Sequence, residues 1–160
     1  MSIQTYWDWD PIFGPKLAAT KLAALEISIR AGGFRTPLER SVREVLIPEL
    51  EHQFDVGGDP SWARLEESTV AKKQAIGRDN GILQETFALR KAVTALARWR
   101  VRDDEAVFTG IPGHAYYGMY HLTGTQNMVA RNWAQWDNAS TDKVAAIFDD
   151  WLEQKIKAVF

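Results

Sequence analysis

The side chains best suited to chemistry lie between residues 113 and 133, which read GHAYYGMYHLTGTQNMVARNW. This stretch holds two histidines, three tyrosines and an arginine, groups that act as acids, bases or metal ligands when a second residue orients them. His114 and His121 are seven residues apart, which is not the HxxxH spacing of a helical metal site. No Asp or Glu lies between Glu105 and Asp137 to complete such a site. The stretch alone therefore predicts neither a metal centre nor a catalytic pair.

Other catalytic patterns are also missing from the sequence. There is no cysteine, no serine sits in a GxSxG motif, and no phosphate-binding GxxxxGK[ST] or GxGxxG occurs. We therefore expect a protein that is not an enzyme, with no catalytic residues, metal or cofactor. One alternative stays open, a small hydrolase that uses His121, and it requires the fold to bring an acidic partner to that side chain.

Length and composition restrict the class of protein. The chain has 160 residues, enough for one domain with a real core, and its seven tryptophans argue against disorder. A net charge of −2 does not suit a protein that coats nucleic acid. No apolar run approaches the roughly 18 residues of a membrane span, and the start, MSIQTYWDWDP, lacks the features of a signal peptide. We expect no membrane contact and synthesis in a cytoplasm.

The first half of the chain predicts helices. Apolar residues at helical spacing predict one helix from about Lys16 to Arg30, which Gly32 and Gly33 end. A second helix is expected to begin at TPLE, with Thr36 as its cap and Pro37 in its first turn. Pro48 lies inside its apolar stripe and should kink or divide it. We read residues 16–54 as a helical part and residues 1–15 as a docking arm.

The second half predicts a mixture of elements. A short helix is expected over 68–76, and alternation from Val93 to Arg102 predicts a strand that a turn at Asp103–Asp104 converts into a β-hairpin. An extended piece is expected over 115–122. A wide apolar stripe from Val144 to Val159 predicts an amphipathic helix, capped by Ser140 or Thr141. The expected fold class is α+β in one domain over 1–160: N-terminal helices, a small antiparallel sheet and a C-terminal helix.

The predicted strand would carry Arg98, Arg100 and Arg102 on one face. Such a face can contact phosphates, remain solvated, or pair with acidic residues of a neighbouring subunit. The final helix supplies candidates for that pairing: Asp142, Asp149, Asp150 and Glu153.

Four segments, in order, resemble phage virion morphogenesis proteins. FDVGGDPSWARLEESTVAKK is similar to that family's G-x-P-W-x-P-L-S-x-x-T-x-x-x-K, and GILQETFALRKAVT to its I-L-x-x-T-G-x-L-x-x-S-I, with Phe87 at the family's glycine. YYGMYHLTG resembles Y-A-x-x-H-x-x-G, and MVARNW resembles I-P-A-R-P-F without its prolines. The matching residues are Trp62, Leu65, Ser68, Thr69, Lys72 or Lys73, Tyr117, His121, Gly124, Arg131 and Trp133.

The resemblance covers residues 54–160, with 55–160 as the family-like α+β core, and it points to the tail completion and head–tail joining proteins of tailed bacteriophages, including the Mu-like ones. It implies a structural virion protein, made in the host bacterial cytoplasm, that forms or joins a ring at the neck. The implied partners are further copies of the chain (six is one arrangement), connector proteins, and tail tube or tail terminator proteins, with non-specific contact to DNA in the channel.

The residues expected to act as interface or structural anchors are Trp62, Tyr117, His121, Arg131 and Trp133. The alternative from another class is a nucleic-acid-binding regulatory module that uses Arg98, Arg100 and Arg102.

Overall fold

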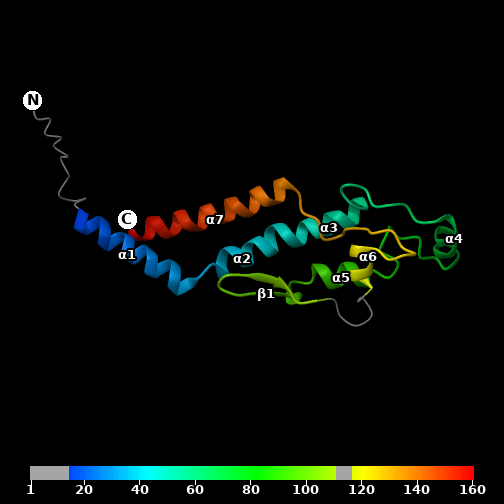
Figure 1. Ribbon diagram of the computed structural model, residues 1–160, viewed down its shortest axis with the longest axis horizontal. Helices are drawn as coiled ribbons and strands as arrows, with labels where there is room; N and C mark the ends of the chain where they lie inside the picture. Colours follow the sequence, from blue (N-terminus) through cyan, green and yellow to red (C-terminus); the bar gives the residue numbers. More distant parts are fainter. Residues whose placement is uncertain (1–14, 111–116) are drawn as a thin grey trace, which may run out of the picture.

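The computed structural model describes residues 15–110 and 117–160 as an elongated, mostly helical molecule with one small hairpin (Figure 1). Helices α1 (Pro15–Gly32) and α7 (Asn138–Val159) lie side by side at one end. The opposite end holds α4 (Glu67–Ala75) and α6 (Gly118–Thr123). The predicted α+β class is confirmed, with little sheet.

The turn after α1 is closed by contacts from distant segments. Gly33 has a φ of +50°, and a Cβ there would lie 2.4 Å from the Cβ of Asp103 in the hairpin. The ring of Phe34 lies 5.9 Å from Phe148 and 5.5 Å from Trp151 on α7. Helix α2 (Arg35–Ser41) therefore begins with Phe34 at its N-cap, and the prediction that Thr36 caps it is wrong.

Pro48 divides the second helical segment, as its position predicts. A π-helical turn (Val42–Leu46) separates α2 from α3 (Ile47–Val56), and the Ile47 N–H bonds to the Val42 carbonyl. Pro48 then falls in the first turn of α3, where its missing N–H costs little.

The predicted strand from Val93 is mostly wrong, although the hairpin is right. Helix α5 (Ala88–Thr94) and a 3-10 turn (Leu96–Arg98) occupy five of the first six positions, and Ala95 links them. Only β1 (Trp99–Val101) pairs, antiparallel, with β2 (Ala106–Phe108). The physical reason is burial against α3, which takes up Leu89, Ala92 and Val93 on one helical face.

The extended piece predicted over 115–122 is wrong where the structure describes it, because residues 118–123 form α6; residues 115 and 116 lie outside the described part. Gly124, with a φ of +74°, ends this helix. A Cβ at that position would lie 3.0 Å from the Ala130 backbone nitrogen, so glycine permits the chain to return closely on itself.

Helix α7 carries its predicted apolar stripe, but another residue caps it. The Asp137 carboxylate accepts the Ser140 N–H at 2.6 Å, and this bond holds the pKa of Asp137 below its ordinary value. Ser140 is instead buried, with its hydroxyl 3.4 Å from Glu49. The predicted caps at Ser140 and Thr141 are therefore wrong.

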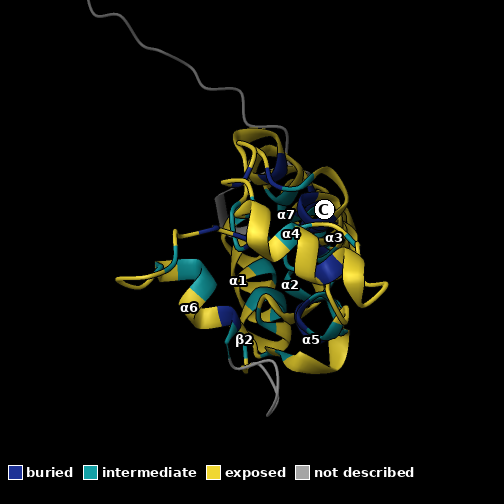
Figure 2. Ribbon diagram, turned by 90° about the vertical axis from the view of Figure 1, so that its right-hand side faces the viewer, coloured by how far each residue is buried: buried dark blue, intermediate teal, exposed yellow. Residues whose placement is uncertain are grey.

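The main core lies between α3 and α5, and Figure 2 shows short buried stretches of the chain among mostly intermediate and exposed ones. Two tryptophans from the loops close it from the side of α6. The cluster consists of Leu50, Phe54, Trp62, Leu89, Val93 and Trp133.

Candidate functional site

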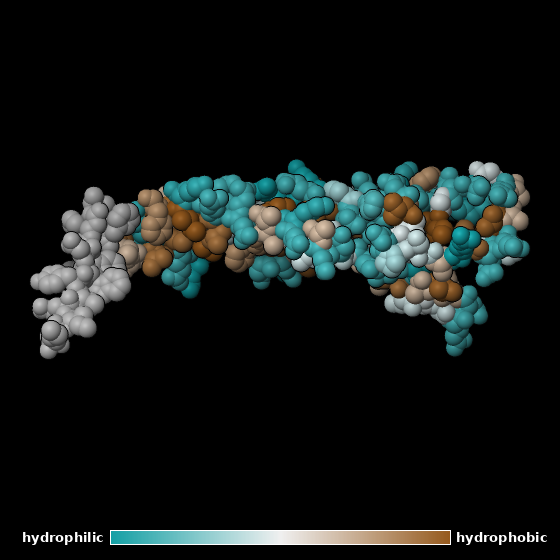
Figure 3. All heavy atoms as spheres, turned by 90° about the horizontal axis from the view of Figure 1, so that it is seen from above, coloured by the Kyte–Doolittle hydropathy of each residue, from teal (hydrophilic) through white to brown (hydrophobic). Residues whose placement is uncertain are grey.

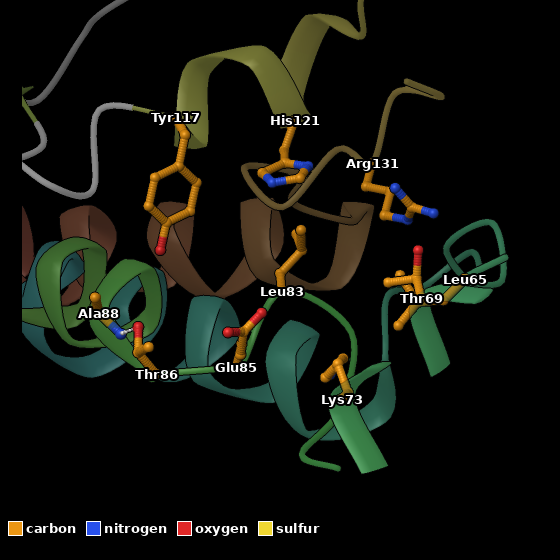
Figure 4. A pocket seen from close by; sticks show the side chains of 10 residues that line it. All are labelled: Leu65, Thr69, Lys73, Leu83, Glu85, Thr86, Ala88, Tyr117, His121 and Arg131. Atoms are coloured by element: carbon orange, nitrogen blue, oxygen red, sulfur yellow. Dashed lines mark hydrogen bonds between the residues drawn. The ribbon is translucent and has the colours of Figure 1, made fainter. Parts of the chain in front are cut away.

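A pocket of about 600 Å³ lies between α4, the segment 83–88 and α6 (Figure 4). Its size suits a ligand or an inserted side chain. Apolar and polar groups share its walls. The residues are Leu65, Thr69, Lys73, Leu83, Glu85, Thr86, Ala88, Tyr117, His121 and Arg131.

Hydrogen bonds between distant segments fix one wall of the pocket. Arg131 Nε donates to the Ala63 carbonyl at 2.9 Å, and its Nη2 donates to the Arg64 carbonyl at 3.1 Å. Trp62 Nε1 donates to the Asn132 carbonyl at 3.0 Å. Residues 62–64 and 131–132 are thus joined by hydrogen bonds that each segment donates to the other.

Helix α6 is attached to the same wall. Trp133 is buried, and its Nε1 donates to the Gly118 carbonyl at 2.9 Å. The Arg131 N–H donates to the His121 carbonyl at 2.6 Å. Tyr117 and His121 stack edge to face with ring centres 5.8 Å apart. The five residues expected to be anchors therefore lie in one neighbourhood, where Trp62 and Trp133 hold the frame and the other three line the pocket.

Two cations in the pocket are unusually buried. Lys73 is 5% exposed and Arg131 is 8% exposed. Lys73 Nζ donates to the carbonyls of Asn80 (2.6 Å) and Gly81 (3.2 Å). Within the described ranges, neither cation has a carboxylate oxygen within 4.0 Å, and Glu85 pairs with Arg78 instead, at 3.4 Å. Buried charges usually require a counter-ion, so the site favours an acidic group.

His121 is placed between these features. Its Nδ1 is buried and has no hydrogen-bond partner among residues 15–110 and 117–160, and desolvation together with the nearby Arg131 charge lowers the pKa of the imidazole below its ordinary value. The hydrolase alternative requires a carboxylate beside His121, and the part of the chain that the structure describes places Arg131 there instead.

The lowered pKa of His121 predicts a pH-dependent stability. Because the unfolded imidazole has an ordinary pKa of 6.5, the unfolded chain binds more protons just below that pH than the folded one. The stability that depends on a neutral His121 is therefore fully present above about pH 6.5 and is lost as the pH falls below that value. We expect urea unfolding experiments to give a free energy of unfolding that falls from pH 7 to pH 5. The slope should be smaller than the slope produced by the uptake of one full proton on unfolding.

The His121→Gln variant should flatten that slope. Equal slopes in the protein and in His121→Gln would contradict the assignment.

The arginines of the predicted strand do not share one strand face. Arg98 belongs to the 3-10 turn, and Arg102 pairs with Glu105 at 3.3 Å. Arg100 instead lines a groove of about 350 Å³ together with Arg35 and Arg43, which the sequence reasoning missed. Four acidic residues of the final helix are the expected partners of Arg98, Arg100 and Arg102. Two of these four form ion pairs within the same chain instead: Asp150 with Arg40 (2.8 Å) and Glu153 with Lys157 (2.9 Å).

Lys73 and residues of the segment 83–88 also line the pocket, although they were not among the residues expected to act as anchors. The resemblance left Lys72 and Lys73 as equal matches; in the structure Lys73 is buried and Lys72 is exposed. Nothing local separates two adjacent lysines, because the carbonyls of residues 80 and 81 that accept from Lys73 depend on a later turn of the chain.

Phe87, in the wall segment, has a φ of +57°, the left-handed region that favours glycine. We expect Phe87→Gly to be more stable than Phe87→Ala by about 1 kcal/mol, because both lose the same ring contacts and only alanine keeps the backbone strain. Urea unfolding measures the difference. The control is Ala71→Gly on the exposed side of α4, where glycine should cost about 1 kcal/mol instead. An alanine variant as stable as the glycine variant would contradict the prediction.

Fold and site together define a mostly helical α+β protein with an amphiphilic pocket at one end. Among residues 15–110 and 117–160, no helix is long and apolar enough to cross a membrane, and no three acidic or histidine side chains are grouped as metal ligands. No protein-family model, curated protein or solved structure matches the chain.

Proposed function

We propose that this chain is a structural virion protein of a tailed bacteriophage that joins head and tail, forming or joining a ring at the head-proximal end of the tail. The observation that carries the proposal is the meeting of the four resembling segments at one end of the molecule. Trp62, Arg131 and Trp133, which belong to two of these segments, make the hydrogen bonds that hold the frame. The resemblance therefore concerns residues that interlock, as expected for a shared framework.

Backbone conformation adds support at two positions. The family's glycine corresponds to Phe87, and that residue has a positive φ in this chain. Gly124, which matches the glycine of Y-A-x-x-H-x-x-G, also has a positive φ and lies against the returning backbone. Both positions favour glycine for a physical reason, which a chance similarity of letters does not require.

The opposite end of the molecule supports a role in assembly. None of the described side chains of α1 is fully buried, and Leu22 (59% exposed) and Ile27 (66% exposed) face solvent. Figure 3 shows hydrophobic side chains gathered at the end where α1 and α7 lie together. Exposed apolar surface of this kind is typical of proteins that bind other proteins.

Electron microscopy of lysates in which the gene for this chain is deleted tests the proposal. We expect DNA-filled heads separate from finished or overlong tails, with joined particles restored by the wild-type gene on a plasmid. Normal infectious particles from the deletion would contradict the proposal.

A second candidate is a nucleic-acid-binding module, favoured by the groove between Arg35, Arg43 and Arg100. Within the described residues, Arg43 and Arg100 have no carboxylate within 4.0 Å, so both are free to contact phosphate. Tight binding of duplex DNA by the purified chain, with affinity falling steeply as salt rises and lost in Arg43→Gln/Arg100→Gln, would favour this candidate.

A further inference from the structure

We infer that the pocket beside α4 and α6 binds the aromatic and acidic segment 7–10 (WDWD) of a second copy of this chain, so that copies join head to tail. The inference rests on the homo-oligomer proposed above and names its interface. It follows from the charge of the pocket, the chemistry of the segment, and the length of chain between the segment and α1.

The charge balance of the pocket points to this segment. Lys73 and Arg131 are both more than nine-tenths buried, and the described residues supply no carboxylate within 4.0 Å of either. Arg131 has five N–H donors, of which the structure shows two in use. Outside the described residues, the chain has only two acidic side chains, Asp8 and Asp10. The neighbouring segment 111–116 (IPGHAY) has none.

The segment also matches the apolar part of the pocket. In an extended chain, Trp7 and Trp9 would project to one side, with Asp8 and Asp10 on the other. In the view of Figure 4, Arg131 and Lys73 lie toward one side of the pocket and Tyr117 toward the other. A volume of about 600 Å³ accommodates a bulky aromatic side chain together with a carboxylate.

The segment cannot reach the pocket of its own chain. Seven Cα-to-Cα steps lead from Asp8 to Pro15, and fully extended they span at most about 25 Å. Helices α4 and α6, which carry pocket residues, lie beyond the N-terminal end of α7 (Figure 1), and the 22 residues of α7 alone extend about 33 Å. The start of α1 lies past the other end of α7, because Lys21 already bonds to the carbonyl of Phe160 (3.0 Å). A segment 7–10 that fills this pocket therefore belongs to another copy.

Such a contact joins two different surfaces of identical chains. Contacts of this type close into a ring if the rotation between copies permits it, and otherwise continue as a filament. The pocket end of one copy and the N-terminal segment of the next would thus build the proposed ring without any further protein.

Sedimentation of the full-length chain provides the first test. We expect Asp8→Asn/Asp10→Asn to weaken self-association at least tenfold while circular dichroism stays unchanged. Asp142→Asn/Asp149→Asn removes two exposed carboxylates from α7 and serves as the matched control, with no effect expected. On the pocket side, Thr69→Trp should weaken association similarly by filling the mouth from an exposed position. Lys73→Met provides a second pocket variant that removes the charge and keeps the stem.

Mixing the two kinds of variant gives the sharpest result. The Asp8→Asn/Asp10→Asn variant keeps an intact pocket, and the Thr69→Trp variant keeps an intact segment 7–10. Each variant is defective alone. In a mixture, the segment of the Thr69→Trp chain can still bind the pocket of the other variant. We expect heterodimers in the mixture and no larger species. Because the chain has no cysteine, Pro11→Cys in one copy and Thr86→Cys in the other should also form a specific disulfide-linked dimer. Pro11→Cys mixed with Ala24→Cys, on α1, is the control pair.

The outcomes separate this inference from the proposed function. The inference is overturned if the segment and pocket variants leave self-association unchanged and Pro11→Cys with Thr86→Cys gives no more disulfide-linked dimer than the control pair. In that case the proposed ring would have to form through another surface. A chain that stays monomeric at every concentration overturns both the inference and the homo-oligomer. Loss of head–tail joining in the deletion lysate is measured independently of either result.

Discussion

Replacing Gly58 by alanine is expected to destabilise the protein by about 2–5 kcal/mol, because backbone strain and overpacking add at this position. Gly58 has a φ of +93°, and a Cβ there would lie 2.4 Å from Cδ1 of Trp62. That indole ring cannot move aside easily. It is buried, packs edge-on against Phe54 with ring centres 5.5 Å apart, and donates its N–H to the Asn132 carbonyl.

The neighbouring Gly57 provides a matched control. Its φ is +76°, also in the left-handed region, but apart from its chain neighbours no described residue has an atom within 4 Å of a Cβ built there. Gly57→Ala should therefore cost only the backbone strain, about 1–2 kcal/mol. Urea unfolding of both variants, followed by tryptophan fluorescence, measures the difference. Equal losses at the two positions would show that the approach of Trp62 to residue 58 is not a constraint in solution.

Replacing Trp133 by alanine is expected to cost about 3–5 kcal/mol, the usual range for a buried large aromatic residue. Trp133 is 4% exposed, belongs to the main core cluster, and ties α6 to it through the hydrogen bond to the Gly118 carbonyl. Its loss leaves a cavity and also releases the wall that carries Tyr117 and His121.

Trp136 lies three residues further along the same loop and is 38% exposed. Replacing it shows whether the loss of any tryptophan would lower the free energy of unfolding as much. We expect Trp136→Ala to change the free energy of unfolding by less than about 1 kcal/mol. A large loss of stability in Trp136→Ala, or a small one in Trp133→Ala, would contradict the assignment of these two residues to surface and core.

The variants of Gly58 and Trp133, each with its control, also help to test the proposed function. Gly58 and Trp133 act on the frame of the pocket, so their variants should lose head–tail joining only through loss of the folded protein. Asp8 and Asp10 lie outside that frame, and a defect in their variant at unchanged stability would concern assembly itself. Comparing the two sets of variants therefore separates folding from joining.

The sequence by itself determined the elements whose signals are local. Gly32 and Gly33 end the first helix, Pro48 divides the second, and the apolar stripe of residues 144–159 specifies the last. Asp103 and Asp104 lie in the turn of the hairpin, as their types predict. In each case a backbone preference or a helical repeat of side chains suffices, whatever lies elsewhere in the chain.

Tertiary structure decided the elements for which local signals compete. Residues 93–98 alternate as a strand does, yet the packing of α5 on α3 keeps residues 93 and 94 in a helix, and a 3-10 turn follows over 96–98. Asp137 prevails over Ser140 as the cap of α7 because Ser140 is buried near Glu49.

The pocket shows the same division most clearly. The sequence pointed to Tyr117, His121 and Arg131, because their types and order resemble a known pattern. It did not show that Lys73 is buried beside them, or that Arg131 reaches the carbonyls of Ala63 and Arg64. Those hydrogen bonds join groups separated by 7 to 68 positions, and only the path of the folded chain determines which backbone oxygens a buried cation meets.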